Sequence, residues 1–284
     1  MSDTAKWVFK RSDGKELVFG NDAFSILEMK GIDTLKPELF SKKKARGDGN
    51  IITGKRIPAR EFSVTAELYD AKQNAMFRPV LNSFFSPRYT YDVTICYINE
   101  PRYVANCELL QFSCPTKNIF YPLKPTVTML APDGYFLSVD AFGHDIASTR
   151  GGMGFPYVNL VNKTFAFGIF EFKGNATFEN DGDVEAHVKA VITFRGEVQN
   201  PRLIMGDAYV KVLDTFVSGD VLVIDASDKS LTKNGENIDT RLEKGSKWAY
   251  LTFDVGENLL SYDADSGNNL MMVRVYFNKR YLGV

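Results

Sequence analysis

The chain has 284 residues, of which 44% are hydrophobic and 24% are charged, and its formal net charge is −1. This length predicts two domains, because a single hydrophobic core stops growing at about 250–300 residues. A net charge near zero produces no field that would favour nucleic acid or an anionic membrane as a partner. Because no apolar run approaches membrane-spanning length and Met1–Lys10 has no signal-peptide core, we predict no membrane insertion and folding in a cytoplasm.

The first half of the chain, residues 1–150, has the pattern of a β-rich domain with one helix. Trp7–Phe9 and Leu17–Phe19 flank a turn and predict a first hairpin. Ser41–Gly54 is basic and then glycine-rich. It fits an anion-binding or partner-binding loop, but we interpret it as a solvated loop. Glu61–Leu68 alternates apolar and polar side chains, which predicts a strand with one buried face.

The helix of this domain is predicted at about residues 71–85. Asp70 precedes it, and Gln73 follows Asp70 at the spacing of a capping box. Pro79 lies inside the segment and is expected to kink or split the helix. Apolar side chains recur at helical spacing and predict a stripe that packs on a sheet, namely Met76, Phe77, Val80, Leu81 and Phe84.

After the helix, two alternating segments, Tyr91–Tyr97 and Tyr103–Leu109, predict a second hairpin. The pattern then loosens, and Ser148–Gly152 is the predicted domain boundary. Residues 151–284 consist almost entirely of short apolar segments separated by turn residues. Short strands at regular spacing with few helices predict a β-sandwich for this second domain.

The clearest strand of the chain is Val184–Phe194. Its even-numbered positions are all apolar, and its odd-numbered positions are polar except for Val191. A period of two over this length places one face on a core and the other in solvent, as in the central strand of a sandwich. Asn180-Asp181-Gly182 turns the chain into this strand, and Gly196 with Asn200-Pro201 ends it.

The search for catalytic or metal-binding groups finds no constellation, so we predict a protein that is not an enzyme and needs no cofactor or metal. His187 is predicted to face solvent, and His144 has an aspartate beside it but no cysteine or serine motif nearby. The three cysteines, Cys96, Cys107 and Cys114, have no C-x-x-C spacing and are interpreted as reduced, buried thiols.

Two further patterns raise the question of a ligand. Asp263-x-Asp265-x-Gly267 is similar to part of a calcium loop, but Arg274 stands where that loop needs an acidic residue, so we interpret the segment as a turn. Trp248 and Tyr250 alternate within Lys247–Phe253 and would form a sugar-stacking platform on a strand, although such aromatics are more often core residues. They are the candidate site of an alternative function, a carbohydrate-binding β-sandwich module in host-surface recognition.

Short turn motifs follow one another in a definite order along the second half. They are Asn180-x-Gly182, Gly196-x3-Asn200-Pro201, Gly219-Asp220, Asn234-Gly235-x-Asn237 and Gly256-x-Asn258. This order resembles that of the distal tail protein family of long-tailed, siphovirus-type phages. The first half fits the same family through Arg56–Leu68, the helix, the second hairpin and Pro122–Phe136. The resemblance therefore covers nearly the whole chain, and the order of the motifs carries it.

The resemblance implies a mainly β protein with two domains: an N-terminal β-rich domain containing one helix, and a C-terminal galectin-like β-sandwich. It implies a structural role, in which copies form a hexameric ring at the end of the tail tube and the tail-tip or baseplate hub assembles on that ring. The N-terminal domain would form the ring contacts. The sequence leaves open whether the source is a phage, a prophage or a phage-tail-like bacteriocin.

The same resemblance implies the partners and the location. The expected partners are other copies of the chain, the tail tube protein, the tail-tip hub protein and receptor-binding proteins. The expected location is the tail tip of the virion, after assembly in the host cytoplasm.

Overall fold

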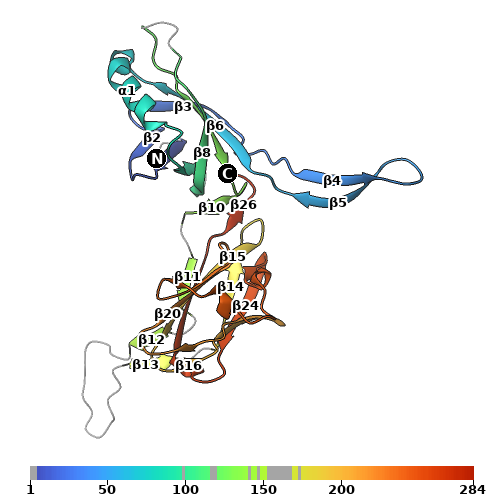
Figure 1. Cartoon of the computed structure of the whole chain (residues 1–284). Helices are drawn as coiled ribbons and strands as arrows, with labels where there is room; N and C mark the ends of the chain where they lie inside the picture. The colour runs from blue at the N-terminus through green and yellow to red at the C-terminus, as the bar shows by residue number, and fades with distance from the viewer. Residues whose placement is uncertain are drawn as a thin grey trace. The chain divides into compact units, whose positions relative to one another are not determined.

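The chain folds into two compact units, which are seen in Figure 1. The structure is a computed structural model, and it describes residues 5–97, 100–115, 120–139, 142–145, 148–151, 168–171 and 174–284. The first unit contains Met1–Val139 together with Arg280–Val284, and the second unit contains Asp140–Lys279. This division differs from the predicted limits, 1–150 and 151–284, in two ways. The boundary lies after Val139, and the last five residues belong to the first unit.

The first unit is built on one antiparallel sheet. Its strands are β1 (Lys6–Arg11), β2 (Glu16–Phe19), β3 (Phe24–Lys30), β6 (Arg60–Leu68), β7 (Tyr91–Cys96), β8 (Arg102–Ser113), β9 (Thr126–Ala131), β10 (Phe136–Ser138) and β26 (Arg280–Tyr281). The order across the sheet is β2-β1-β7-β8-β9-β6-β3, and β10 pairs with both β8 and β26. The two predicted hairpins are confirmed, since β1 pairs with β2 and β7 pairs with β8.

An aromatic-rich apolar cluster fills this unit. The ring centroid of Phe9 lies 5.4 Å from that of Phe19 and 5.4 Å from that of Phe85. The inward face predicted for β6 is confirmed. It consists of Phe62, Val64, Ala66 and Leu68, each of which is at most 1% exposed.

The helix α1 spans Asn74–Phe84 and follows the short 3-10 helix η1, Ala71–Gln73. Asp70 caps this segment by accepting a hydrogen bond from the N–H of Lys72 at 2.9 Å. The predicted split at Pro79 is wrong, because a proline removes only one hydrogen bond and the helix continues through it. The predicted stripe is too wide. Met76 and Val80 are 69% and 46% exposed, since α1 presents only a narrow face, with Leu81 and Phe84, to the core.

Arg11 connects the end of α1 to the sheet. Its guanidinium donates hydrogen bonds to the carbonyl oxygens of Ser83 at 2.8 Å and Phe84 at 3.0 Å, so it places a cation at the negative end of the helix dipole. It also donates two hydrogen bonds to the carboxylate of Asp13, at 2.8 and 2.6 Å. These hydrogen bonds lower the pKa of Asp13 from its ordinary value to about 2.

The second unit is a β-sandwich, because two sheets contribute side chains to one apolar cluster. The first sheet has the order β11-β25-β15-β20-β21-β22, with β23 also paired to β15. These strands are β11 (Phe142–Asp145), β25 (Met271–Phe277), β15 (Ala186–Phe194), β20 (Val221–Asp225), β21 (Ser230–Lys233), β22 (Glu236–Asn237) and β23 (Thr252–Phe253). The second sheet consists of β14 (Asn175–Asn180), β24 (Gly256–Asp263), β17 (Arg202–Met205) and β18 (Ala208–Lys211), in that order.

Smaller elements complete the second unit. Two short ladders pair β12 (Ser148–Gly151) with β13 (Gly168–Glu171), and β16 (Val198–Gln199) with β19 (Thr215–Phe216). Three 3-10 helices are also described, η2 (Asp239–Arg241), η3 (Trp248–Tyr250) and η4 (Asn268–Leu270). The mainly β fold class is therefore confirmed, and the galectin-like character of the sandwich stays a prediction.

Strand β15 is central, as the alternating pattern predicts. It pairs with β20 along one edge and with β25 along the other. Its apolar positions face the core, namely Ala186, Val188, Ala190, Ile192 and Phe194, each at most 3% exposed. On the opposite face, Lys189 forms an ion pair with Asp225 at 3.1 Å.

The turn motifs are held by asparagine side chains. Asn180 is fully buried, accepts a hydrogen bond from the N–H of Gly182 and donates one to the carbonyl oxygen of Phe253, both at 3.1 Å. Asn258 accepts from the N–H of Asp254 at 2.9 Å and donates back to its carbonyl oxygen at 2.7 Å. These residues satisfy backbone groups that a turn would otherwise leave unpaired.

The Arg11–Asp13 pair predicts an acid dependence of the first unit. Because the pKa of Asp13 falls from 3.8 to about 2 on folding, the pair stabilises the unit fully above about pH 4 and loses this contribution as the pH falls toward 2. Asp13→Asn should remove this part of the acid dependence and lower the urea midpoint at neutral pH. The measurement is Trp7 fluorescence in a Trp248→Phe background. Asp22→Asn, at an exposed position, is the control, and equal acid profiles for the two variants would contradict the assignment.

The two faces of β15 predict opposite mutational effects. Ile192→Asp or Phe194→Asp should unfold the second unit, because an unpaired buried charge costs several kcal/mol, comparable with the total stability of a domain. Lys189→Ala should cost less than about 1 kcal/mol, since the lysine is half exposed and Asp225 keeps a hydrogen bond from the Ser227 hydroxyl at 2.6 Å. Thermal unfolding of the three variants measures this difference. Equal midpoints would show that the two faces are assigned wrongly.

Candidate subunit interface

A two-stranded ribbon extends from the sheet of the first unit (Figure 1). It consists of β4 (Glu38–Lys43) and β5 (Asn50–Arg56), joined by the turn at residues 44–49. The interpretation of Ser41–Gly54 as a solvated loop is therefore wrong, because most of this segment forms a β-hairpin. The basic residues and glycines that favour a loop are concentrated in and around its turn.

The ribbon exposes apolar side chains on both of its faces. Cross-strand partners share a face and neighbours along a strand alternate, so the register places Phe40 and Ile51 on one face and Leu39 and Ile52 on the other. Their exposed fractions are 49%, 54%, 55% and 54% in that order. Exposed apolar side chains gathered on one element are a common feature of interaction sites.

Both edges of the ribbon are also open, since β4 and β5 pair only with each other among the described strands. An open edge presents unpaired N–H and C=O groups to another chain, and an isolated two-stranded hairpin is at best marginally stable in water. At its base, Arg56 donates a hydrogen bond to Glu38 at 2.6 Å and lies over the ring of Phe40 at 5.6 Å from the centroid. These contacts keep the base ordered but cover little of the apolar surface.

The ribbon is strongly basic within a nearly neutral protein. Its basic side chains, Lys42, Lys43, Lys44, Arg46, Lys55 and Arg56, are accompanied by only two acidic ones, Glu38 and Asp48. All eight residues are exposed. The ribbon thus combines exposed apolar side chains with basic ones, four in or beside the turn and two at the base, and a surface of this chemistry can dock on another protein and select it by charge.

The structure does not place Trp248 and Tyr250 on a strand. The predicted strand Lys247–Phe253 is instead the 3-10 helix η3 followed by the short strand β23. Trp248 is half-buried and packs against the sandwich core. A 3-10 helix has three residues per turn, so residues two apart in it do not share a face as they would on a strand. A sugar site at these residues stays a prediction.

The two histidines lie on different strands of the second unit. His144 is in β11, where its backbone lies opposite Val275 in the register. His187 is half-buried on β15, so it is less exposed than the pattern predicts, because its neighbour Thr252 on β23 lies opposite it.

The cysteines are free thiols. Cys107 is buried, which raises the pKa of its thiol, and Cys96 and Cys114 are half-buried. In the calcium-like segment, Asp263 pairs with Arg202 and Asp265 pairs with Lys211 at 2.9 Å. These cations lower the pKa of both carboxyl groups.

The described residues contain neither a metal-binding cluster nor a membrane-spanning helix. No three His, Cys, Asp or Glu side chains come together there in a way that could hold a metal ion. In the same part of the chain, no helix combines the length and apolar character that crossing a membrane requires.

Comparison with known proteins gives a match to one family model and matches to solved structures. Residues 181–281 match the family model of the siphovirus-type tail component, C-terminal domain. No curated protein sequence matches the chain.

Solved structures match over nearly the full length. The Dit protein of phage SPP1 has a TM-score of 0.67 at 16% identity, over 97% of this chain and 99% of that one. A chain of the phage P2 baseplate in its activated conformation with calcium has a TM-score of 0.55 at 8% identity, over 99% of this chain and 100% of that one. At such identities the likeness establishes the fold alone.

The part of the second unit from residue 181 onward is therefore similar to the C-terminal domain of siphovirus-type tail components. The whole chain has the fold of the SPP1 Dit protein, and the predicted resemblance to the distal tail proteins of siphovirus-type phages is confirmed.

The ribbon predicts a stability pattern that distinguishes it from the core. Replacing Phe40 and Ile52 together by serine should change the stability of the first unit by less than about 0.5 kcal/mol, because both side chains are already exposed. Phe62→Ser, at a residue that is 1% exposed, should cost about 3–5 kcal/mol. Urea unfolding followed by Trp7 fluorescence compares them. A large loss in the ribbon variant would mean that the ribbon packs on its own unit.

Proposed function

We propose that this chain is a structural subunit of a phage tail tip, where it forms a ring that joins the tail tube to the hub and the adsorption apparatus. The observation that carries the proposal is the full-length likeness to SPP1 Dit, which is described as a paradigm of the hub adsorption apparatus in phages that infect Gram-positive hosts. The baseplate chain of phage P2 shares the same fold. The family match in the second unit supports the same assignment independently of the fold.

The first unit supplies the ring contacts in this proposal, and the ribbon is the contact element. A closed ring needs heterologous contacts, in which one patch of a subunit meets a different patch of its neighbour. The ribbon is such a patch, because it carries apolar side chains on two faces and has two open edges. We propose that the ring has six copies, the number that the resemblance to distal tail proteins implies.

The proposed partners are other copies of the chain, the tail tube protein, the hub protein and receptor-binding proteins. The proposed role is that of a connector without catalysis, since stacking between rings requires complementary surfaces and no reacting group. The protein then belongs to the virion, and we propose that it assembles into tails in the host cytoplasm.

The alternative function, a carbohydrate-binding module, is not favoured by these matches. Its candidate residues, Trp248 and Tyr250, lie in a 3-10 helix and not on an alternating strand. A sugar role would have to be additional to the structural one.

Deletion of the gene from its phage or prophage tests the proposed function. Tails should be absent or should lack a tip in electron micrographs, and the wild-type gene supplied in trans should restore them. Complete and infective tails without this protein would end the proposal.

Complementation with variants tests the ribbon. Phe40→Asp with Ile52→Asp should fail to restore tails although the purified protein is folded, because charges on an apolar contact surface oppose its burial. Leu259→Asp in the second unit is the matched control, since Leu259 is 53% exposed but lies outside the first unit. Normal tail tips with the ribbon variant would remove the ribbon from the ring contact and leave the ring itself intact.

A further inference from the structure

The segment Arg280–Val284, here called the strap, belongs to the first unit although it follows the whole second unit in the sequence. Its strand β26 pairs with β10, with Tyr281 opposite Phe136 and Arg280 opposite Leu137. The first unit is therefore completed by residues that are separated from the rest of it by the entire sandwich.

Two cation–π contacts fasten the strap to its neighbours. The guanidinium of Arg102 lies 3.5 Å from the ring centroid of Tyr281, and that of Arg280 lies 3.9 Å from the ring centroid of Tyr135. Each such contact contributes about 0.5–1 kcal/mol at exposed sites and more when the groups are shielded from water. The strap is thus held by side chains as well as by strand pairing.

The end of the strap contacts both segments that connect the ribbon to the sheet. The ribbon root comprises these segments, residues 31–37 before β4 and residues 57–59 after β5, together with Arg60, the first residue of β6. On the first side, the N–H of Val284 donates a hydrogen bond to the carbonyl oxygen of Ile32 at 3.3 Å. On the second side, Arg60 donates through Nη2 to the carbonyl oxygen of Leu282 at 2.7 Å.

Arg60 depends on the strap for its hydrogen bond. Its side chain is 7% exposed and lies 4.8 Å from the ring centroid of Phe136, and burial lowers its pKa. A buried guanidinium without acceptors is costly, and the carbonyl group of Leu282 provides one. Loss of the strap would remove this acceptor. It would also remove Tyr281, which lies opposite Phe136 in the pairing of β26 with β10.

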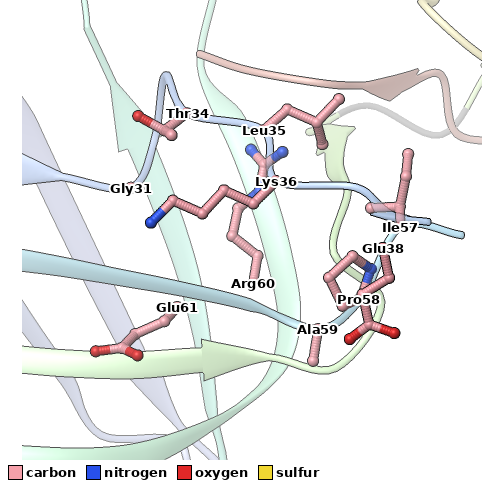
Figure 2. A pocket seen from close by; sticks show the side chains of 10 residues that line it. All are labelled: Gly31, Thr34, Leu35, Lys36, Glu38, Ile57, Pro58, Ala59, Arg60 and Glu61. Atoms are coloured by element: carbon pink, nitrogen blue, oxygen red, sulfur yellow. The ribbon is translucent and has the colours of Figure 1, made fainter. Parts of the chain in front are cut away.

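Ile32 of the ribbon root packs in the core of the first unit, but the two segments of the root leave a space between them. A hollow of about 440 Å³ opens between its two segments, and Figure 2 shows the side chains around it. The lining residues come from both segments and include Leu35, Lys36, Ile57 and Arg60. Strand pairing holds the two segments together at their ends, β3 with β6 on one side and β4 with β5 on the other, and the strap adds contacts between those ends.

We propose that the strap is a positioning element for the ribbon: by bonding to Ile32 and Arg60, it fixes the ribbon root and therefore the direction in which the ribbon projects. A chain then presents a correctly placed ribbon only after its second unit has been synthesised, because the strap follows that unit. The consequence for ring assembly rests on the proposed function, whereas the positioning of the root does not.

The test compares the full chain with a chain that ends at Lys279. Hydrogen–deuterium exchange is followed in peptides that cover residues 31–37 and 57–60, with peptides from β15 as the internal reference. We expect exchange in both root segments to rise roughly tenfold, and β15 to be unchanged. Trp7 fluorescence in a Trp248→Phe background should show an unfolding midpoint lower by about 5 °C for the first unit.

Point variants of the full chain keep the proposal testable if the shortened chain does not fold. Arg60→Met retains an apolar stem but removes the donor to Leu282, and Arg88→Met at an exposed position is its control. Faster exchange at residues 31–37, where the strap bonds to Ile32, supports the proposal. Unchanged exchange at both root segments in the Arg60 variant overturns it. If gene deletion leaves tails complete while root exchange rises, the proposed function fails and the positioning role stands.

Discussion

A two-stranded ribbon cannot bury its own side chains, and this constraint explains why the first unit is incomplete as a single copy. In β6, alternation places every second residue in a core, whereas in β4 and β5 both sets of positions face water. Covering the exposed parts of Leu39, Phe40, Ile51 and Ile52 would contribute on the order of 3–6 kcal/mol per copy. In a closed ring every copy gains this contribution, so weak individual contacts become a stable assembly.

Charge adds selectivity to this apolar contact. The whole chain has a formal net charge of −1, but the ribbon concentrates basic side chains around its turn. Burial of apolar area contributes affinity but little specificity. A cluster of basic side chains attracts an acidic surface and repels a basic one, so it contributes specificity. In the proposed contact, the basic side chains would set which surface the ribbon accepts, and the apolar side chains would provide the burial that holds it there.

The sequence predicts those elements whose determinants are local. Strands β6 and β15 alternate cleanly because one face of each lies on a core, and Asp70 marks the start of the helical segment. The ribbon is missed because two-sided exposure removes the alternation and the basic, glycine-rich turn favours a loop. The strap is missed for a different reason. Its partners, Ile32, Arg60 and β10, lie far away in the sequence, so no local pattern reports them.

The residues that identify the family differ from those that would make its contacts. Asn180, Asn234 and Asn258 hold turns through side-chain hydrogen bonds, and Asn234 also has a positive φ of 52°. Backbone geometry restricts which residues fit such positions, so they leave a recognisable order of motifs, and the family match at residues 181–281 includes Asn234 and Asn258. The ribbon has no comparable restriction from its own fold. Different side chains at Phe40 or Ile52 would leave the fold of a single copy intact, and the surface that they meet in a neighbouring protein is what restricts them.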